Sequence, residues 1–305
     1  WRPMLRLHEE VRDALGHGEP VVALESTVIA HGLPRPTNRD VAVRAEQAVR
    51  DAGAVPATIA VIDGVINVGL DDRALDRLAN DDGFAKASCR DLPRVIAQGT
   101  SAATTVASTA HIAAGAGIGF FATGGLGGVH RGAAETFDES ADLGVLGRTP
   151  LVVVCAGVKS ILDVGATLER LESLSVPVVT LGGDRFPGFY LRDSGHASPA
   201  TVADADEVAR MSVARTALGM TQAIVVAQPI AEADEMDHAL HDRLLAGALA
   251  AADAQGVHGK DVTPFVLAHF HQNSGGVSEA SNVALLYANC ALAGRIAAAH
   301  AHGLG

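Results

Sequence analysis

The sequence predicts an α/β protein with a mostly parallel central sheet, helices on both of its faces and a helical C-terminal third. Short apolar runs of strand length alternate with amphipathic stretches of helical period along most of the chain. Strands separated by helices favour parallel pairing under a helical cover on both faces. Hydrophobic residues make up 48% of the 305 residues and aromatic residues only 4%. We therefore expect a core built mainly of Ala, Val, Leu and Ile.

The predicted strands are apolar runs bounded by glycine, proline or charged residues. Their continuous hydrophobic character is typical of strands that are covered on both faces. They lie at Val21–Glu25, Thr58–Asp63 with a short return at Val65–Gly69, Ile118–Ala122, Leu151–Cys155, Val178–Leu181 and Ala223–Ala227.

The predicted helices place apolar residues three or four positions apart. One begins at Asn38 or Asp40, runs through Asp51 and is closed by Gly53. The others are expected within residues 1–15 and at Asp71–Asn80, Leu92–Gln98, Ser101–Ala114, Ile161–Leu174, Val202–Leu218, Glu235–Ala254, Pro264–His271 and Ser278–Ala299. Since no internal repeat or break in composition divides the sequence, we expect residues 1–305 to form a single domain.

Composition narrows the class of protein and its partners. A net charge of −12 without a basic stripe argues against nucleic acid as a partner, although a small anionic ligand needs only a local site. No apolar run approaches the ~18 residues of a membrane span, and residues 1–15 do not resemble a signal peptide, so we expect a cytoplasmic protein without a membrane partner. Cys89, Cys155 and Cys290 lack metal-ligand spacing and are expected to be reduced, buried thiols.

Glu25 stands at the end of the first predicted strand, in Leu24-Glu25-Ser26-Thr27. A carboxylate after a run of apolar residues is partly desolvated unless it is paired, and desolvation raises its pKa toward the range of a general acid or base. The Pro- and Gly-rich turn that follows, His31–Asn38, lies where ligands of open α/β sheets bind. A salt-bridged Glu at a strand end is the alternative interpretation.

Two segments of small residues are candidates for holding a phosphate group. Gly99–Ser108 places hydroxyl and small side chains at an expected helix start, where backbone N–H groups and the helix dipole favour an anion. An ordinary Ser/Thr cap on a packed helix is the alternative. Thr123–Arg131 is a glycine-rich loop that permits close backbone approach to a ligand, with His130 and Arg131 as candidate polar contacts. Its spacing does not match GxGxxG, so support for a dinucleotide site is weak.

Asp138 and Asp142 are four residues apart in the acidic segment DESAD. On a helical turn they are expected to share a face. Carboxylate oxygens with room for water suit a hard divalent ion such as Mg²⁺ or Mn²⁺. A solvated acidic turn is the alternative interpretation.

Lys159 is the candidate for covalent chemistry. Lysine occurs only at Lys86, Lys159 and Lys260, so a lysine beside an apolar run suggests amine chemistry that arginine cannot supply. We expect Lys159 at the start of a helix, where the helix dipole and apolar neighbours both disfavour the ammonium form. A neutral amine can form an imine with a sugar carbonyl carbon. The alternative is a lysine whose stem packs while its head reaches water.

Together these segments resemble the pseudouridine-5′-phosphate glycosidase family, which includes the indigoidine synthase A-like proteins. The matching stretches are collinear over roughly residues 20–290. They read ALESTVIAHGLPRPTN, PATIAVIDGVINVGL, KASCRDLP, FATGGLGGVHRGAAETFDESADL, VVVCAGVKSILD, FPGFYLRDSG and TPFVLAHFHQNSGG.

The resemblance implies reversible cleavage of the C–C glycosidic bond of pseudouridine 5′-phosphate to uracil and ribose 5-phosphate. It also implies a divalent ion, usually Mn²⁺, and a homotrimer. By motif, Lys159 corresponds to the lysine that forms a covalent adduct with ribose C1′, Glu25 to the proton donor and Asp138 to the metal ligand. The positions that it assigns to substrate binding are Lys86, Thr105, Val106, His130, Ser140, Ala141, Asp142 and Asn282.

The sequence departs from the family pattern near its C-terminus. Val277 follows Gly275-Gly276 where a basic residue is expected, and His269–Gln272 replaces a more charged segment. Two other functions stay open. One is a nucleotide- or sugar-phosphate-binding oxidoreductase that uses the glycine-rich loop, and the other is a non-catalytic phosphosugar-binding protein.

Overall fold

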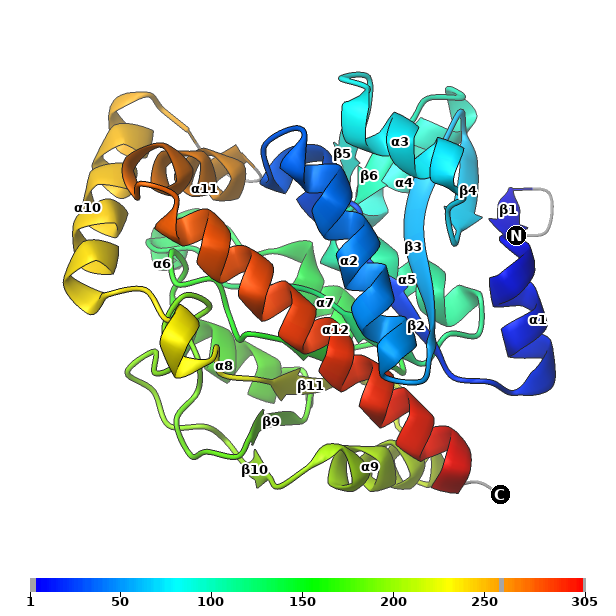
Figure 1. Cartoon of the computed structure of the whole chain (residues 1–305). Coiled ribbons are helices and arrows are strands. Elements are labelled where there is room, and N and C mark those ends of the chain that lie inside the picture. Colours follow the sequence, from blue (N-terminus) through cyan, green and yellow to red (C-terminus); the bar gives the residue numbers. More distant parts are fainter. Residues whose placement is uncertain (1–3, 258–260, 304–305) are drawn as a thin grey trace.

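A sheet of 11 strands lies at the centre of the molecule, within residues 4–257 and 261–303, which are the residues that a computed structural model describes (Figure 1). The strands are β1 (Leu5–Leu7), β2 (Val21–Leu24), β3 (Val55–Ile62), β4 (Val65–Val68), β5 (Ala85–Ala87), β6 (Ala102–Thr104), β7 (Phe120–Ala122), β8 (Val152–Cys155), β9 (Val178–Leu181), β10 (Thr201–Val202) and β11 (Ile224–Ala227). Along the main path their order is β1-β4-β3-β2-β7-β8-β11-β9-β10, while β6 joins β3 to β5.

Most neighbouring strands are parallel, which confirms the fold class. β2 pairs in parallel with β3 and β7, and β8 pairs in parallel with β7 and β11. Both antiparallel pairs of strands in the described part of the chain involve β3, which pairs with β4 and with β6. The β3–β4 pair is the short return predicted at Val65–Gly69. Because the strands are covered on both faces, their sequences are continuous apolar runs rather than alternating ones.

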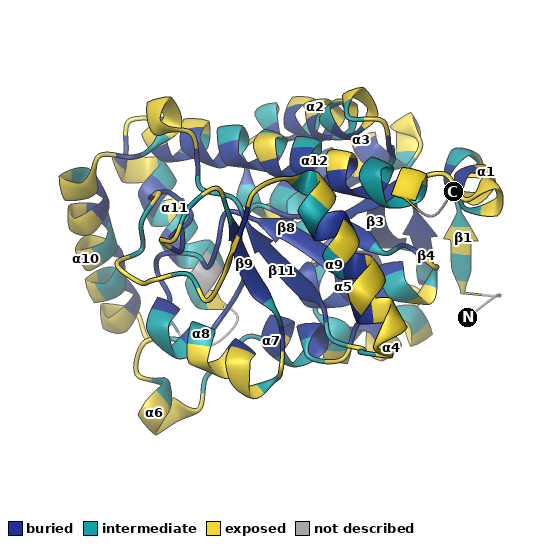
Figure 2. Ribbon diagram, turned by 90° about the horizontal axis from the view of Figure 1, so that it is seen from below, coloured by how far each residue is buried: buried dark blue, intermediate teal, exposed yellow. Residues whose placement is uncertain are grey.

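Helices cover both faces of this sheet. They are α1 (Glu9–His17), α2 (Thr37–Asp51), α3 (Asp72–Asn80), α4 (Leu92–Ala97), α5 (Val106–Gly115), α6 (Ala133–Thr136), α7 (Ala141–Leu146), α8 (Val164–Ser173), α9 (Ala205–Ala217), α10 (His238–Ala254), α11 (Val262–Asn273) and α12 (Val277–Gly303). α2 and α12 lie over one face, and α7 and α8 lie on the other (Figure 1 and Figure 2). The C-terminal third is helical, as predicted.

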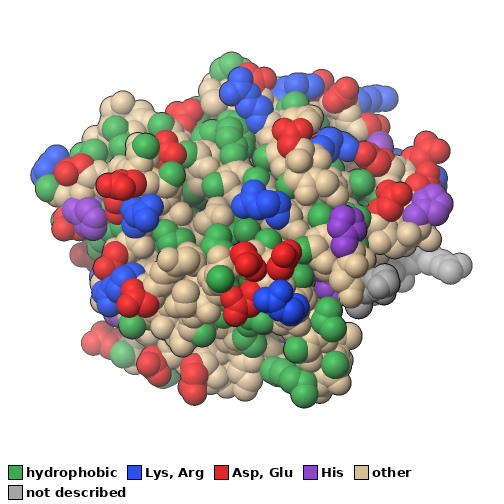
Figure 3. All heavy atoms as spheres, turned by 60° about the horizontal axis from the view of Figure 1, so that its bottom comes forward, with side chains coloured by type: hydrophobic (Ala, Val, Ile, Leu, Met, Phe, Trp, Pro, Cys, Tyr) green, Lys and Arg blue, Asp and Glu red, His purple; other side chains and the backbone are tan. Residues whose placement is uncertain are grey.

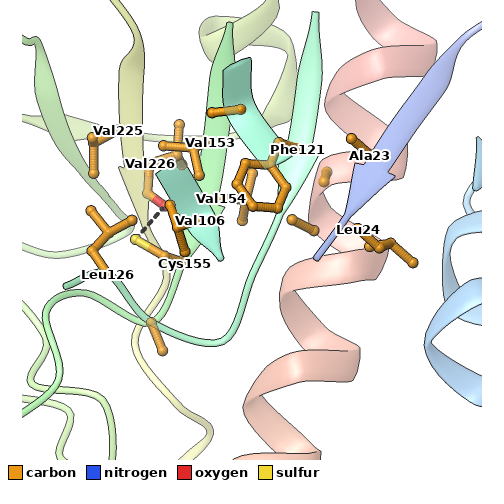
Figure 4. Packing of buried hydrophobic residues seen from close by; sticks show 14 of the residues in the cluster. Ala23, Leu24, Val106, Phe121, Leu126, Val153, Val154, Cys155, Val225 and Val226 are labelled. Carbon is orange, nitrogen blue, oxygen red and sulfur yellow. Dashed lines mark hydrogen bonds between the residues drawn. The ribbon is translucent and has the colours of Figure 1, made fainter. Parts of the chain in front are cut away.

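The core between these layers is aliphatic. The strands β8 and β11 are buried along their whole length, and Phe121 of β7 packs among their valines (Figure 4). The helices expose their outer sides, whereas the central strands are buried (Figure 2). Cys155 Sγ lies 3.8 Å from the carbonyl oxygen of Val226, and burial raises the pKa of its thiol to about 12. Cys290 is likewise buried, but Cys89 is only partly buried.

α12 corrects one expectation about the chain. In the described residues it is the one helix that is long and apolar enough to cross a membrane, by length and composition only. No segment of this kind was expected from the sequence. It runs diagonally over the sheet and contacts α2, α9, β7 and β8 (Figure 1). Half of its most apolar window, 50%, is buried in these contacts, as is common for a central helix of a globular fold.

Several predicted boundaries were wrong because pairing between distant segments overrides local preference. The helix expected over Ser101–Ala114 begins only at Val106, since Ala102–Thr104 pairs with β3 and β5. Residues Leu5–Leu7 form a strand beside β4 instead of the start of a helix. The helix expected from Val202 begins at Ala205, after a short strand that pairs with β9. β5 was not predicted at all.

Candidate active site

A cavity of about 330 Å³ opens at the edge of the sheet where the carboxyl ends of β2 and β7 meet. A second, smaller cavity of about 60 Å³ adjoins it and shares with it Glu25, Lys86 and Lys159. Among the residues predicted from the sequence, those that line the first cavity are Glu25, Lys86, Thr105, Val106, His130, Asp138, Ser140, Ala141, Asp142 and Lys159. Asn282 of α12 lines the second. The structure thus brings the residues that the family resemblance assigns to the site into two adjoining cavities.

Glu25 directly follows β2, and its carboxylate accepts a hydrogen bond from the hydroxyl of Thr123, which directly follows β7. Burial raises the pKa of Glu25, while the positive charge of Lys159, the Thr123 hydrogen bond and the charge of Lys86 act in the opposite direction. The hydrogen-bond partner is a neutral hydroxyl. The carboxyl group is therefore able to hold a proton at higher pH than an exposed Glu and to transfer it into the cavity.

Lys86, in the middle of β5, is the second cationic group of the cavity. Burial lowers its pKa, the charge of Lys159 lowers it further, and the carboxylates of Glu25 and Asp142 oppose both effects. The charges of Lys159 and Asp142 thus act on both Glu25 and Lys86 across the same space. Two groups with shifted pKa values in one cleft are typical of an active site.

Lys159 does not lie at a helix terminus, so that part of the prediction was wrong. α8 begins at Val164, and Asp163 caps it by accepting a hydrogen bond from the N–H of Ala166 at 2.9 Å. The segment from Lys159 to Asp163 instead forms backbone hydrogen bonds with the glycine-rich loop after β7. The N–H of Lys159 donates to the carbonyl of Leu126 at 3.2 Å, and that of Asp163 donates to Val129 at 2.9 Å. These long-range bonds keep the Lys159 segment out of the helix.

Asp142 has a different role from the one that its spacing indicated. Its carboxylate is 6% exposed and accepts hydrogen bonds from the N–H groups of Ala107 and Gly127, both at 2.9 Å. A Cβ atom at position 127 would lie 2.7 Å from Asp142 Oδ2, so the loop reaches this carboxylate only because residue 127 is glycine. Asp142 thus ties the glycine-rich loop to the start of α5.

Asp138 and Asp142 do not share a helical face, because α7 begins between them. Ser140 caps that helix by accepting a hydrogen bond from the N–H of Asp142 at 3.2 Å. Asp138 precedes the cap, and its Oδ2 lies 3.7 Å from Nδ1 of His130. Burial lowers the pKa of His130, and the carboxylate of Asp138 opposes that effect.

The donor set for a divalent ion is small. No group of three or more His, Cys, Asp or Glu side chains arranged for a metal occurs within the described residues. A single carboxylate, that of Asp138, fits an ion that keeps most of its waters or shares oxygen ligands with a bound phosphate, as Mg²⁺ and Mn²⁺ commonly do. The residues present therefore fit a loosely held, oxygen-ligated ion and not a fully protein-ligated one.

The predicted phosphate-binding segment is shorter than expected. From Gly99–Ser108 only Thr105 and Val106 line the cavity. Thr105 and Ser108 form a capping box in which the N–H of Thr105 donates to the Ser108 hydroxyl at 2.8 Å. Since Asp142 takes the N–H of Ala107, the segment acts partly as an ordinary helix cap, which was the alternative interpretation.

Some lining residues were not predicted from the sequence. They are Thr27, Ser88, Arg90, Asp91, Gly127 and Glu139. Ser88, Arg90 and Asp91 belong to KASCRDLP, the same stretch that pointed to Lys86, so their proximity in sequence was a usable signal. Arg131, expected as a polar contact of the loop, lines neither cavity and binds the backbone of the Lys159 segment instead.

The second cavity is formed by segments from both halves of the chain. Asn282, which is 4% exposed, lies there with Gly124, Gly125 and Phe189. A Cβ atom at position 125 would lie 2.9 Å from a carbon of the Phe189 ring, so glycine there lets the aromatic wall close over the loop. Val277, the departure from the family pattern, lines neither cavity.

Figure 3 shows the side chains on one outer face of the molecule. Acidic and basic side chains are interspersed there, with small hydrophobic patches between them. This mixed distribution agrees with a net charge of −12 that is spread over the chain.

Comparison of sequences relates the chain to one family over nearly its whole length. Residues 10–299 match the family described as "Indigoidine synthase A like protein". A Frankia alni protein named pseudouridine-5′-phosphate glycosidase is 57% identical over 291 residues, covering 95% of this chain and 81% of the relative. A Streptomyces griseus protein of the same name is 56% identical, covering 97% of this chain and 92% of the relative.

Comparison of structures agrees with this result. The prealnumycin C-glycosynthase AlnA, solved in complex with ribulose 5-phosphate, matches with a TM-score of 0.91 at 36% identity and covers 99% of this chain and 98% of its own. An indigoidine synthase A-like protein from Thermotoga maritima matches with a TM-score of 0.87 at 35% identity, covering 97% and 96% of the two chains.

Proposed function

The chain belongs to the indigoidine synthase A-like family, and on this premise we propose that it reversibly cleaves the C–C glycosidic bond of pseudouridine 5′-phosphate. The products are uracil and ribose 5-phosphate. The observation that carries the proposal is the convergence of Glu25, Lys86 and Lys159 on one cavity, with Asp138 and His130 on its wall. The names of the relatives support the substrate, and the complex of AlnA supports a phosphosugar pocket in this fold.

The bond to be broken explains why these residue types are needed. The leaving atom is a carbon, C5 of uracil, so an acid that assists departure of the base is not sufficient. We assign to Glu25 the transfer of a proton to the ring oxygen of the ribose while the C1′–oxygen bond breaks. The amine of Lys159 forms a bond to C1′ and releases a proton. The two-carboxylate mechanism of ordinary glycosidases is therefore not the template.

The remaining steps return the protein to its starting state. C5 of uracil takes up a proton, and the electron pair of the C1′–C5 bond moves to the base as that bond breaks. The nitrogen lone pair of Lys159 then completes an iminium ion with C1′. Water adds to this carbon, the C–N bond breaks, and ribose 5-phosphate leaves. The sum is one pseudouridine 5′-phosphate plus one water giving one uracil plus one ribose 5-phosphate.

The choice of Lys159 rather than Lys86 as the nucleophile rests on the family motif and on the charge distribution. Lys159 is the cation with the larger influence on the proton donor Glu25. Lys86 then supplies positive charge for the substrate, together with contacts from Thr105, Val106, Ser140, Ala141 and Asp142. His130 and Asn282 complete the binding surface in this proposal.

A divalent ion, Mn²⁺ by resemblance, belongs to the proposal as well. Asp138 would hold it, and when bound it would supply positive charge that orients the phosphate or the base. His130, beside Asp138, helps to fix the orientation of that carboxylate. We also propose a homotrimer, as the family resemblance implies, and a cytoplasmic location, as expected from the sequence.

The oxidoreductase alternative has less support from the glycine-rich loop. Three of its N–H groups are already bound within the protein: that of Leu126 donates to Gly157 at 3.0 Å, that of Gly127 to Asp142 at 2.9 Å, and that of Val129 to Thr167 at 2.9 Å. A dinucleotide site needs such groups free for the pyrophosphate. We therefore favour the glycosidase.

Borohydride trapping tests the proposal. Wild-type protein incubated with ribose 5-phosphate and borohydride is expected to carry a ribose 5-phosphate adduct on the peptide that contains Lys159. The variant Lys159→Ala is expected to keep its fold and to bind ribose 5-phosphate, but to lose turnover and trapping. An adduct on the peptide of Lys86, with activity retained in Lys159→Ala, would reassign the nucleophile. Binding without turnover in the wild type would instead indicate a phosphosugar-binding protein.

A further inference from the structure

Ser160, the residue next to Lys159, is bound by a histidine from the helical C-terminal third. Ser160 Oγ lies 2.8 Å from Nε2 of His241 on α10, although 81 residues separate them in the sequence. His241 Nδ1 in turn lies 3.1 Å from Oδ1 of Asp242. Ser160 and His241 are buried, with 7% and 3% exposure, whereas the Asp242 side chain is 79% exposed. This chain of contacts could not be predicted from the spacing of these residues in the sequence.

The order Ser–His–Asp resembles a hydrolytic triad, but its location excludes that role. A nucleophilic serine must reach the substrate. Ser160 lines neither cavity of the site, within the residues that the structure describes. Its hydroxyl instead contacts the buried ring of His241. Any role of this trio in the reaction must therefore act through its neighbour, Lys159.

The protonation of His241 suits it to hold the serine hydroxyl. Burial lowers the pKa of His241, so the imidazole is neutral near pH 7. The groups that face the ring are Asp242 and His238 of α10 and Arg131 of the glycine-rich loop, and Phe270 of α11 packs edge-on with ring centroids 5.8 Å apart. With Nδ1–H donated to Asp242, Nε2 accepts a hydrogen bond from the Ser160 hydroxyl.

The backbone of this segment is anchored independently. The guanidinium group of Arg131 donates to the carbonyls of Ser160 at 3.3 Å and Ile161 at 3.1 Å. The carbonyl of Lys159 accepts the N–H of Leu162 at 2.9 Å. Lys159 thus sits in a short irregular loop, outside any helix or strand, and its orientation depends on such individual contacts.

We propose that His241 is a positioning residue, which fixes the rotation of the loop through Ser160 and thereby directs the amine of Lys159 toward the sugar carbon. This inference rests on the proposed function of Lys159. Reaction rates are sensitive to small misplacement of the attacking atom, so the effect belongs in the covalent step and not in substrate binding. The second anchor, Arg131, limits the effect of losing the first.

Single-turnover trapping measures the covalent step directly. The rate at which ribose 5-phosphate becomes fixed to Lys159 by borohydride is compared for wild type, Ser160→Ala, His241→Ala and the double variant. We expect each single variant to lose roughly tenfold in this rate and in kcat, with KM within about twofold of wild type. Both changes break the same contact. The double variant is therefore expected to lose the same factor in rate as either single variant, and not the product of the two losses.

Three further variants separate positioning from folding. His241→Gln keeps an acceptor for Ser160 and is expected to recover most of the rate. His238→Ala, on the same helix with a 63% exposed side chain, controls for changes to α10. Thr149→Val removes a buried hydroxyl that binds the carbonyl of Val145 at 2.7 Å, ahead of β8, and is expected to leave the trapping rate unchanged. Thermal melts identify any variant that does not fold, in which case Ser160→Ala and His241→Gln carry the test.

The outcomes distinguish a failure of the positioning role of His241 from a failure of the proposed function. Trapping on Lys159 at the wild-type rate in folded Ser160→Ala and His241→Ala overturns the positioning role alone. The same conclusion follows if the two losses multiply in the double variant. If wild-type protein turns over without any adduct on Lys159, the proposed mechanism is overturned and the inference falls with it.

Discussion

Two partly buried glutamates, Glu25 and Glu46, have nearly the same local chemistry but lie in different surroundings. Glu25 accepts a hydrogen bond from Thr123, and Glu46 of α2 accepts one from Thr58 of β3 at 2.6 Å. Burial is the largest influence on both and raises the pKa of each carboxyl group, while the threonine opposes it in each case. A buried carboxyl with a raised pKa is therefore not in itself a sign of catalysis here.

The difference lies in what each carboxyl group faces. Glu25 borders a cavity with two lysines, and Lys159 is the strongest charge acting on it. Glu46 lines neither cavity of the site, and the charge acting most on it is Arg50, which is already bound to Glu10. Access to a cavity and to unpaired amines, more than the perturbed pKa, separates a candidate acid from a structural one.

The largest expected difference between the two glutamates appears when each is replaced by glutamine. Glu25→Gln keeps an oxygen that accepts from Thr123 but has no proton to give, so kcat should fall by roughly 10²- to 10⁴-fold. Glu46→Gln should leave kcat within about twofold. Steady-state assays with pseudouridine 5′-phosphate, on protein checked by circular dichroism, measure both. Equal losses in the two variants would mean that Glu25 acts on stability and not on proton transfer.

The pH dependence gives a second, smaller contrast. If Glu25 must be protonated, kcat/KM falls as pH rises through its raised pKa. Thr123→Val removes a hydrogen bond that lowers this pKa, so the falling limb should move to higher pH, with a loss of up to about tenfold in kcat. The matched variant Thr58→Val, beside Glu46, should leave the limb in place. A limb that does not respond to Thr123→Val would belong to another group.

The smallest effect concerns stability. A carboxyl group whose pKa is raised in the fold contributes stability that is fully present below its unfolded pKa, about 4.3, and is lost as pH rises through the folded value. At pH 7 the raised pKa of Glu46 therefore weakens the fold. Glu46→Gln should raise the free energy of unfolding by on the order of 1 kcal/mol at pH 7.

Urea unfolding at pH 7 and at pH 4 measures this change. The gain should largely vanish at pH 4, where the wild-type carboxyl is protonated in both states. A variant that is less stable than wild type at pH 7 would show that the hydrogen bond from Thr58 outweighs the cost of burying the charge.

The amino-acid sequence was sufficient to predict the fold class and the positions of the main candidate catalytic residues. Apolar runs with helices between them predicted the parallel sheet, because hydrophobic periodicity is a local property of the chain. The ends of those runs located Glu25 and Lys159 at one edge of the sheet, since the carboxyl ends of neighbouring parallel strands meet there. The collinear motifs added Lys86, Asp138 and their neighbours.

The local conformation and the hydrogen bonds of these residues depend on tertiary contacts, which the sequence did not predict. The start of α8, the strand at Ala102–Thr104, the bonds from Ala107 and Gly127 to Asp142, and the contact of His241 with Ser160 all join segments distant in sequence. Helix and strand propensities differ by only about 1 kcal/mol per residue, so a few long-range hydrogen bonds and the packing around them prevail. For that reason Lys159 lies in a loop held from both sides, where the local sequence alone indicated the start of a helix.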